Sequence, residues 1–155
     1  MKKFRFPLKP VLRAEEVALV EALAAHQELE QLLQLAEEAR QALEQQLADQ
    51  EREFLEQFRR DPRALALRSG RQQLRDHGER MRFMLAQRRG ELEGLLELSQ
   101  QRVAGHRREI ARLEKVREGK FSEYSDLVKK SEQETLDELS LGLFARKKAS
   151  AFPSS

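Results

Sequence analysis

The chain of 155 residues contains no cysteine and no tryptophan, and it has only one tyrosine and four prolines. The absence of cysteine excludes disulfide bonds and thiol chemistry, and it suits a reducing compartment such as the cytoplasm. No run of about 18 uncharged apolar residues is present, so we expect no membrane-spanning helix. Basic residues interrupt the stretch that follows Lys2 and Lys3, so we expect no signal peptide and a cytoplasmic chain.

The residues that are present favour long helices. Charged residues make up 36% of the chain and hydrophobic residues 39%, whereas aromatic residues make up only 6%. The apolar residues are mostly leucine and alanine, and they are scattered among glutamate, glutamine and arginine. This composition is typical of helices that pair as coiled coils rather than of a compact core. The sequence therefore predicts an all-α fold.

A stripe of apolar residues extends from Met81 to Val128 at alternating steps of three and four, and no proline interrupts it. A single helix cannot bury such a stripe, so the stripe requires a partner surface of similar length. A similar spacing over residues 11–43, with Ala25 and Leu32 on the stripe, makes the first third of the chain the expected partner. After Leu43 we expect a slip in the phase of this first stripe.

Breaks in the pattern divide the chain into segments. Asp61-Pro62 and Ser69-Gly70 are expected to interrupt the helix, and Gly142 is expected to cap it. We therefore predict a long antiparallel two-helix coiled-coil hairpin with a short helical break near the tip. The predicted segments are an extended N-terminal segment at 1–9, a first coiled-coil helix at 10–58, a turn with a short helix at 59–70, a second coiled-coil helix at 71–141 and a flexible basic tail at 142–155.

Charge supports this antiparallel pairing. With a turn near residue 66, the numbers of facing residues add up to about 132, because a short turn makes neighbouring helices antiparallel. The acidic residues from Glu44 to Glu56 then lie opposite the arginines from Arg75 to Arg89. The same register leaves the second helix without a partner on the first helix from about residue 123 onward. This overhang and the N-terminal segment form an open end, whose apolar residues are Phe4, Phe6, Leu127, Leu136, Leu139, Leu143 and Phe144.

Signals for chemistry are weak. The spacing of the three histidines does not indicate a metal site, and we recognise no phosphate-binding loop or nucleophile with a base. We therefore expect no enzyme activity, metal or cofactor. The arginines of residues 59–89 could bind nucleic acid, but pairing with the acidic stretch is the favoured interpretation. Four apolar residues lie close together in the sequence and offer more apolar surface than a two-helix seam needs. They are Met81, Phe83, Met84 and Leu85, and they either pack against the turn or form a docking patch.

Two stretches carry a family resemblance. The start, Phe4-Arg-Phe6-Pro-Leu8-Lys-Pro-Val11-Leu12, resembles the opening F-x-F-x-L-x-x-V-L of the flagellar export protein J (FliJ) family. The end is similar to the closing segment of the same family. It comprises Leu113-Glu-Lys-Val, Tyr124, Glu132-Gln-Glu-Thr-Leu136-Asp-Glu138 and Phe144.

The resemblance implies an antiparallel coiled coil of the flagellar type III protein export apparatus. Its expected partners are a hexameric export ATPase, which it enters as a central stalk, the cytoplasmic domain of the export-gate membrane protein, and export chaperones. We expect no nucleic acid partner, and membrane association only peripherally, through the apparatus on the cytoplasmic face. The candidate ATPase-binding residues are Phe4, Phe6, Leu8, Val11, Leu12, Gln133, Leu136, Asp137 and Glu138. The candidate gate-binding residues are Met81, Phe83, Met84 and Leu85.

Two alternatives stay open at the level of the sequence. One is the equivalent stalk of a virulence type III injectisome, which shares the architecture. The other is a generic structural or DNA-binding coiled coil. The sequence also permits either a monomeric hairpin or a dimer.

Overall fold

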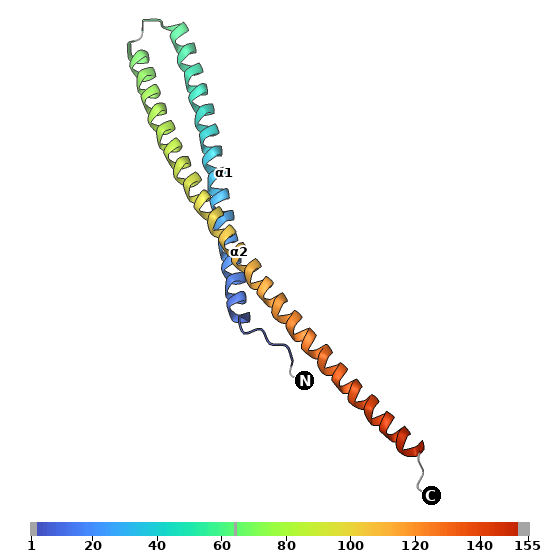
Figure 1. Ribbon diagram of the computed structural model, residues 1–155. Coiled ribbons are helices and arrows are strands. Elements are labelled where there is room, and N and C mark those ends of the chain that lie inside the picture. Colours follow the sequence, from blue (N-terminus) through green and yellow to red (C-terminus); the bar gives the residue numbers. More distant parts are fainter. Residues whose placement is uncertain (1–2, 64, 152–155) are drawn as a thin grey trace. The chain divides into compact units, whose positions relative to one another are not determined.

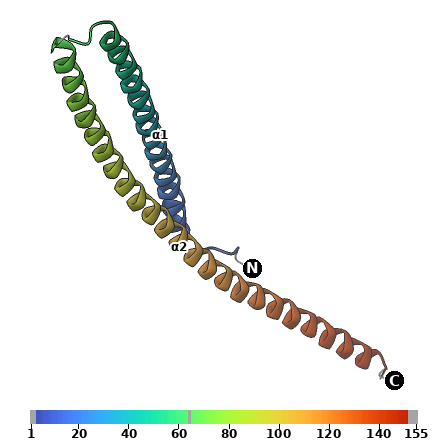
Figure 2. The same ribbon diagram turned by 90° about the horizontal axis from the view of Figure 1, so that it is seen from above.

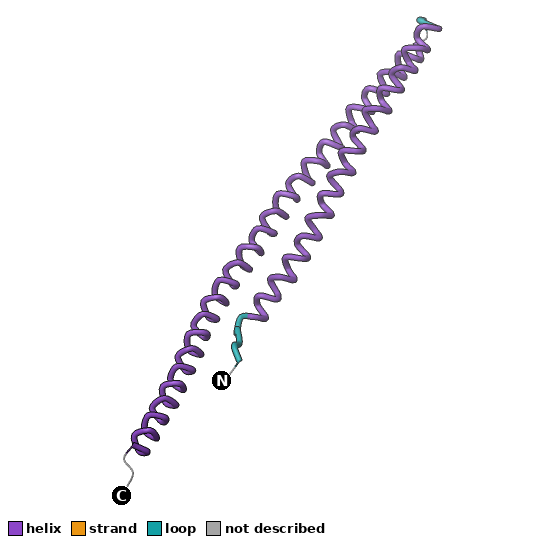
Figure 3. Tube along the Cα trace, turned by 90° about the vertical axis from the view of Figure 1, so that its right-hand side faces the viewer, coloured by secondary structure: helices purple, strands orange, loops and turns teal. Residues whose placement is uncertain are grey.

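A computed structural model describes residues 3–63 and 65–151 of the chain. Helix α1 spans Lys9–Arg60 and helix α2 spans Leu65–Ala151 (Figure 1). The remainder of the described chain consists of turns and extended segments, and it contains no strand (Figure 3). The two long helices pack against each other, so the predicted all-α helical hairpin is confirmed.

The chain divides into two compact units, which are described separately. One unit is formed by Val17–His106, and the other by Met1–Glu16 together with Arg107–Ser155. In the first unit, the later part of α1 and the earlier part of α2 lie side by side and are joined at one end by a turn (Figures 1 and 2).

The turn is shorter than predicted. Helix α1 ends at Arg60, where the backbone N–H of Asp61 still donates to the carbonyl of Gln57 at 2.9 Å. Pro62 follows, and it disfavours the helical conformation at the residue before it. Helix α2 then begins at Leu65 and continues without interruption. Both predicted bounds of the turn, 59 and 70, are therefore wrong, and so is the separate short helix within it.

Packing explains why Ser69-Gly70 does not interrupt α2. A Cβ added at Gly70 would lie 3.2 Å from the ring of Phe54, so this glycine lets the two helices approach closely. The guanidinium carbon of Arg68 lies 5.7 Å from the centroid of the Phe58 ring, a favourable cation–π distance. These contacts across the hairpin offset the low helix propensity of glycine, about 1 kcal/mol relative to alanine.

The register of the hairpin differs from the prediction by six or seven residues, about one heptad. His26 contacts Ser99, and Glu44 contacts Arg82. In these two pairs the residue numbers add up to 125 and 126, whereas a turn near residue 66 predicted a sum of about 132. Because seven residues make two turns of a coiled-coil helix, a shift of one heptad by itself does not change which helix faces meet.

The seam of α1 keeps its phase, and the predicted slip after Leu43 is wrong. Ala25 and Leu32, which were placed on the stripe, are exposed, whereas His26 and Leu33 are half-buried. With these residues on the seam, steps of three and four alternate without interruption. The seam residues in this unit are buried or half-buried, except Arg40. They are Leu19, Ala22, His26, Leu29, Leu33, Ala36, Arg40, Leu43, Leu47, Gln50 and Phe54.

In the other unit, the start of the chain packs onto the later part of α2. Phe6, Leu12 and Leu113 form a buried cluster, and Phe4 and Ile110 are packed against it. Residues 3–8 are not helical, and the backbone N–H of Lys9 donates to the carbonyl of Phe6 at 3.1 Å where α1 begins. Pro10 lies in the first turn of the helix, where its missing N–H costs no hydrogen bond.

Helix α2 extends beyond its predicted end. It continues through Gly142 to Ala151, so residues 142–151 are helical rather than a flexible tail. One glycine costs a helix about 1 kcal/mol. The residues after Gly142 are mostly leucine, phenylalanine, alanine, arginine and lysine, and no proline occurs before Pro153. The last four residues of the predicted tail lie outside the described residues.

Candidate partner-binding surfaces

The N-terminal motif meets α2 through aromatic contacts. The ring of Phe4 lies 5.2 Å from that of Phe121, centroid to centroid, at an interplanar angle of 81°. It also lies 5.6 Å from the ring of Tyr124. These distances are typical of favourable aromatic pairs. Tyr124, expected to lie beyond the reach of the first helix, thus contacts the extended segment that precedes this helix.

The five N-terminal candidates fall into three groups by exposure. Phe6 and Leu12 are 8% and 4% exposed, so their side chains hold the N-terminal segment on α2. Phe4 is half-buried among the aromatic residues. Leu8 and Val11 are 40% and 46% exposed. Of the N-terminal motif, Leu8 and Val11 therefore offer the apolar surface to a partner.

The overhang of α2 begins after Tyr124. Val128 and Ser131 are half-buried, whereas every residue from 132 to 150 is exposed. A shallow groove follows the helix surface at this point. Its lining residues are Tyr124, Val128, Ser131, Glu132, Thr135 and Leu136.

The four C-terminal candidates lie on this exposed stretch. The side chain of Leu136 lines the groove and is 57% exposed. The amide of Gln133 donates to the carboxylate of Asp137 at 3.0 Å, one helical turn away. Glu138 is also exposed. The structure therefore places one apolar and three polar side chains where a partner has access to them.

The four gate-binding candidates do not form one surface. Met81 and Leu85 are half-buried on the seam of α2, whereas Phe83 and Met84 are 69% and 61% exposed. All four lie well inside the paired part of the unit Val17–His106, more than four helical turns from the turn at Pro62. Only Phe83 and Met84 therefore offer apolar surface to a partner at this position.

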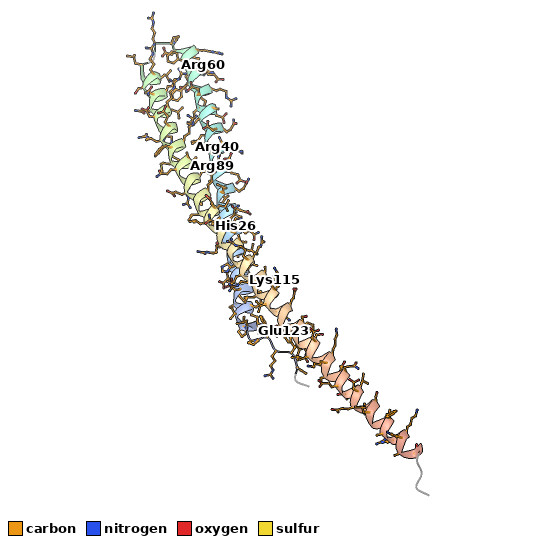
Figure 4. All side chains as sticks on the ribbon, in the orientation of Figure 1. His26, Arg40, Arg60, Arg89, Lys115 and Glu123 are labelled. Atoms are coloured by element: carbon orange, nitrogen blue, oxygen red, sulfur yellow. The ribbon has the colours of Figure 1, made fainter. Side chains whose placement is uncertain are left out.

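Several arginines of the basic stretch pair with acidic residues of α1. The Nε atom of Arg82 donates to Glu44 at 2.6 Å, and this hydrogen bond lowers the pKa of the Glu44 carboxyl. Arg89 lies 3.3 Å from Glu37, which also binds Arg40 of its own helix at 2.7 Å. Arg40 on α1 and Arg89 on α2 are labelled in Figure 4. The hydrogen bond from Arg40 is the main reason that the pKa of Glu37 is lowered.

Arg71 similarly pairs with Glu51 and lowers the pKa of this carboxyl. Opposite charges thus meet across the hairpin, as the sequence predicts. Arg71, Arg82 and Arg89 serve this pairing, although exposed ion pairs are individually weak.

His26 is a seam residue that the sequence interpretation missed (Figure 4). Its Nδ1 atom lies 3.1 Å from the hydroxyl oxygen of Ser99, and its Nε2 atom lies 3.0 Å from a carboxylate oxygen of Glu30. The spacing of four residues after Ala22 indicates the position, but the neighbouring Ala25 is the apolar residue of the two and fits the stripe pattern better. A polar pair inside a seam favours one register over others.

None of the helices in the part of the chain described here has an apolar stretch long enough to span a lipid bilayer. Within residues 3–63 and 65–151, no three histidine or carboxylate side chains come together as they do around a metal ion. Comparisons with protein-family models, with curated proteins and with solved structures found no match.

Proposed function

We propose that this chain is a non-enzymatic component of the flagellar type III protein export apparatus. It acts there as a central stalk of the hexameric export ATPase and as an adaptor to the export gate and to export chaperones. Its place is the cytoplasmic face of the membrane, with which it associates peripherally through the apparatus.

One observation carries this proposal. The two stretches that resemble the FliJ family are about a hundred residues apart in the sequence, yet they pack against each other. Phe6 and Leu12 of the opening motif share a buried cluster with Leu113, and Phe4 contacts Tyr124. Leu113 and Tyr124 belong to the closing signature. The packing of the two signatures against each other supports a common role for them in one surface.

The exposed residues near this cluster are the proposed ATPase-binding surface. Leu8 and Val11 are exposed on one side, and Leu136 is 57% exposed on the overhang of α2. Apolar side chains of this size are the usual anchors of protein interfaces when a partner buries them. Phe6 and Leu12 contribute indirectly, because they fix the N-terminal segment on α2.

The test is co-purification and ATPase stimulation with a flagellar export ATPase. We expect the wild-type chain to bind, and we expect Leu8→Asp combined with Leu136→Asp to weaken binding at least about tenfold, which corresponds to about 1.4 kcal/mol. The matched control is Leu55→Asp, because Leu55 is 45% exposed but lies in the other unit. No binding by the wild-type chain, or equal binding by the double variant, would contradict the proposal.

The proposed gate-binding surface needs a separate experiment. Phe83→Ala together with Met84→Ala should weaken binding to the cytoplasmic domain of the export-gate protein while the helical content stays unchanged. Val17→Ala is the control, since Val17 is a 59% exposed apolar residue of the same unit. If the double variant binds the gate domain like the wild type, the surface lies elsewhere.

The same experiments separate the alternatives. A stalk of a virulence injectisome binds the ATPase of that system and not the flagellar enzyme. A DNA-binding coiled coil shifts DNA with a steep salt dependence, because each phosphate contact releases counterions. Pairing of Arg71, Arg82 and Arg89 with α1 favours the export function over DNA binding.

A further inference from the structure

The two flanks of the hairpin in the unit Val17–His106 differ in chemistry. On one flank, Glu44 pairs with Arg82 and Glu37 pairs with Arg89. Glu37, Glu44 and Arg82 directly follow the buried or half-buried seam residues Ala36, Leu43 and Met81, and Arg89 lies one heptad after Arg82. In an antiparallel pair, residues that follow the seam on both helices share one side, so residues that precede it share the opposite side.

The opposite flank carries four exposed leucines. Leu32 and Leu35 precede the seam residues Leu33 and Ala36 on α1, and they are 41% and 59% exposed. On α2, Leu95 and Leu98 precede the half-buried residues Leu96 and Ser99, and they are 47% and 63% exposed. We name these four residues the leucine flank.

The leucine flank is continuous along the hairpin. In the observed register, where facing residue numbers add up to 125 or 126, Leu95 lies level with residues 30 and 31 of α1. The four leucines therefore fall within about nine residues of α1, or roughly 13 Å. Ala25 and Ala39, one heptad before and after Leu32, are exposed and small, so they allow another helix to approach this side.

The unit buries little apolar surface by itself. Of its described residues, only Ala22, Leu43, Leu92 and Val103 are hydrophobic and less than a tenth exposed. Two helices alone rarely enclose a sufficient core, and grouped apolar residues at a surface usually mark an interface. A second pair of helices on the leucine flank would bury it and complete a four-helix core.

We propose that two copies of this chain associate through their leucine flanks to form an antiparallel four-helix bundle. A two-fold axis parallel to the helices places α1 of one copy beside α2 of the second copy at the same level. Leu32 and Leu35 then meet Leu95 and Leu98 of the second copy. The inference goes beyond the proposed export function and does not depend on it.

Charge selects a second copy in this orientation. On the flank of α1, Glu21 and Glu28 precede seam residues, and on the flank of α2, Arg102 does so. In the observed register Arg102 lies level with residues 23 and 24, between the two glutamates. Pairing α1 with α2 of the second copy sets Glu21 and Glu28 near Arg102, whereas pairing α1 with α1 at the same level sets each of these glutamates against its own copy. Glu91, also on this flank, is partnered by Arg88 at 3.7 Å.

The mass of the purified full chain in solution, measured by light scattering over a range of concentrations, tests this dimer. We expect the wild-type chain to reach twice the mass of one chain. Leu35→Glu combined with Leu98→Glu should raise the dissociation constant at least about 100-fold, because charged groups replace buried leucines. Val20→Glu is the matched control, since Val20 is 66% exposed and follows its seam residue Leu19 on the other flank.

A charge exchange tests the orientation. Arg102→Glu should weaken the dimer about tenfold, and adding Glu21→Arg and Glu28→Arg to that variant should restore most of the loss. Circular dichroism of each variant verifies that the helices form. A chain that stays monomeric at high concentration overturns the proposal, and so does a dimer that persists in the double leucine variant. If a foreign amphipathic helix occupies the flank instead, the isolated chain is monomeric.

Discussion

Gly78 of α2 lies so close to Leu47 of α1 that a Cβ on the glycine would be 2.9 Å from the Cδ1 atom of the leucine. Gly78 is buried, and its missing side chain lets the two helices approach. Gly90, on the same helix, has no atom within 4 Å of such a Cβ. Gly78 therefore permits the close approach of the two helices, whereas Gly90 takes no part in the packing between them.

We expect Gly78→Ala to destabilise the hairpin and Gly90→Ala to stabilise it. Alanine gains about 1 kcal/mol of helix propensity at either position. At Gly78 the crowding of Leu47 costs more than this gain, since overpacking typically costs about 1–3 kcal/mol. Urea unfolding of both variants measures the difference. Equal stabilisation by the two substitutions would show that Leu47 moves aside without cost.

The His26 and Ser99 side chains should be energetically coupled. A double-mutant cycle with His26→Ala and Ser99→Ala isolates their interaction, for which we expect about 0.5–1.5 kcal/mol. The control cycle uses His26 and Glu30, because side chains one turn apart on the same helix contribute only about 0.2–0.5 kcal/mol. Additive effects of the first two substitutions would mean that the polar pair does not stabilise this register.

Acid should destabilise the unit Val17–His106. Arg82 lowers the pKa of Glu44 in the folded chain, and Glu37 and Glu51 shift in the same direction. A lowered pKa means that the folded state binds protons less readily than the unfolded state. The stability from these pairs is therefore complete above the usual glutamate pKa of about 4.3 and is lost as the pH falls below it.

Thermal unfolding near neutral pH and near pH 3 tests this dependence. The decrease in melting temperature should be smaller for Glu44→Gln than for the wild type, because the variant has no carboxyl to protonate. Glu56→Gln removes an exposed carboxyl from the same helix and serves as the control. An equal decrease for Glu44→Gln and the wild type would indicate that the ion pair with Arg82 contributes nothing.

Much of this fold follows from local patterns. The apolar spacing predicts two long helices, Pro62 predicts the position of the turn, and the charge blocks predict antiparallel pairing. The exact register could not be predicted from the apolar spacing, because a shift of one heptad again brings seam positions opposite seam positions. Contacts across the hairpin distinguish the two registers, among them the pair of His26 with Ser99 and the close approach of Gly70 to Phe54.

The candidate surfaces were harder to predict for a related reason. Residue type indicates that Phe6, Leu8 and Leu12 are apolar, but not which of them α2 covers. The structure buries Phe6 and Leu12 and exposes Leu8. His26 was missed because a polar residue on a seam departs from the apolar pattern, and its partner Ser99 lies 73 residues away in the sequence.

The contact between Phe4 and Tyr124 can be observed directly. Tyr124 is the only tyrosine and the chain has no tryptophan, so the near-ultraviolet circular dichroism of the tyrosine band reports on this residue alone. A ring held against Phe4 and Phe121 gives a strong signal, because its surroundings are fixed and asymmetric. We expect Phe4→Ala to reduce this signal markedly.

Phe144→Ala is the matched control for this measurement, since Phe144 is 64% exposed on the overhang of the same helix. It should leave the tyrosine band unchanged. Hydrogen exchange adds a second readout, because loss of Phe4 should weaken the protection of the N-terminal segment around Lys9, where α1 begins. A tyrosine band that responds equally to both substitutions would mean that the N-terminal segment does not rest on α2 in solution. Leu8 and Val11 would then lose their fixed place beside the overhang, and with it the surface proposed to bind the ATPase.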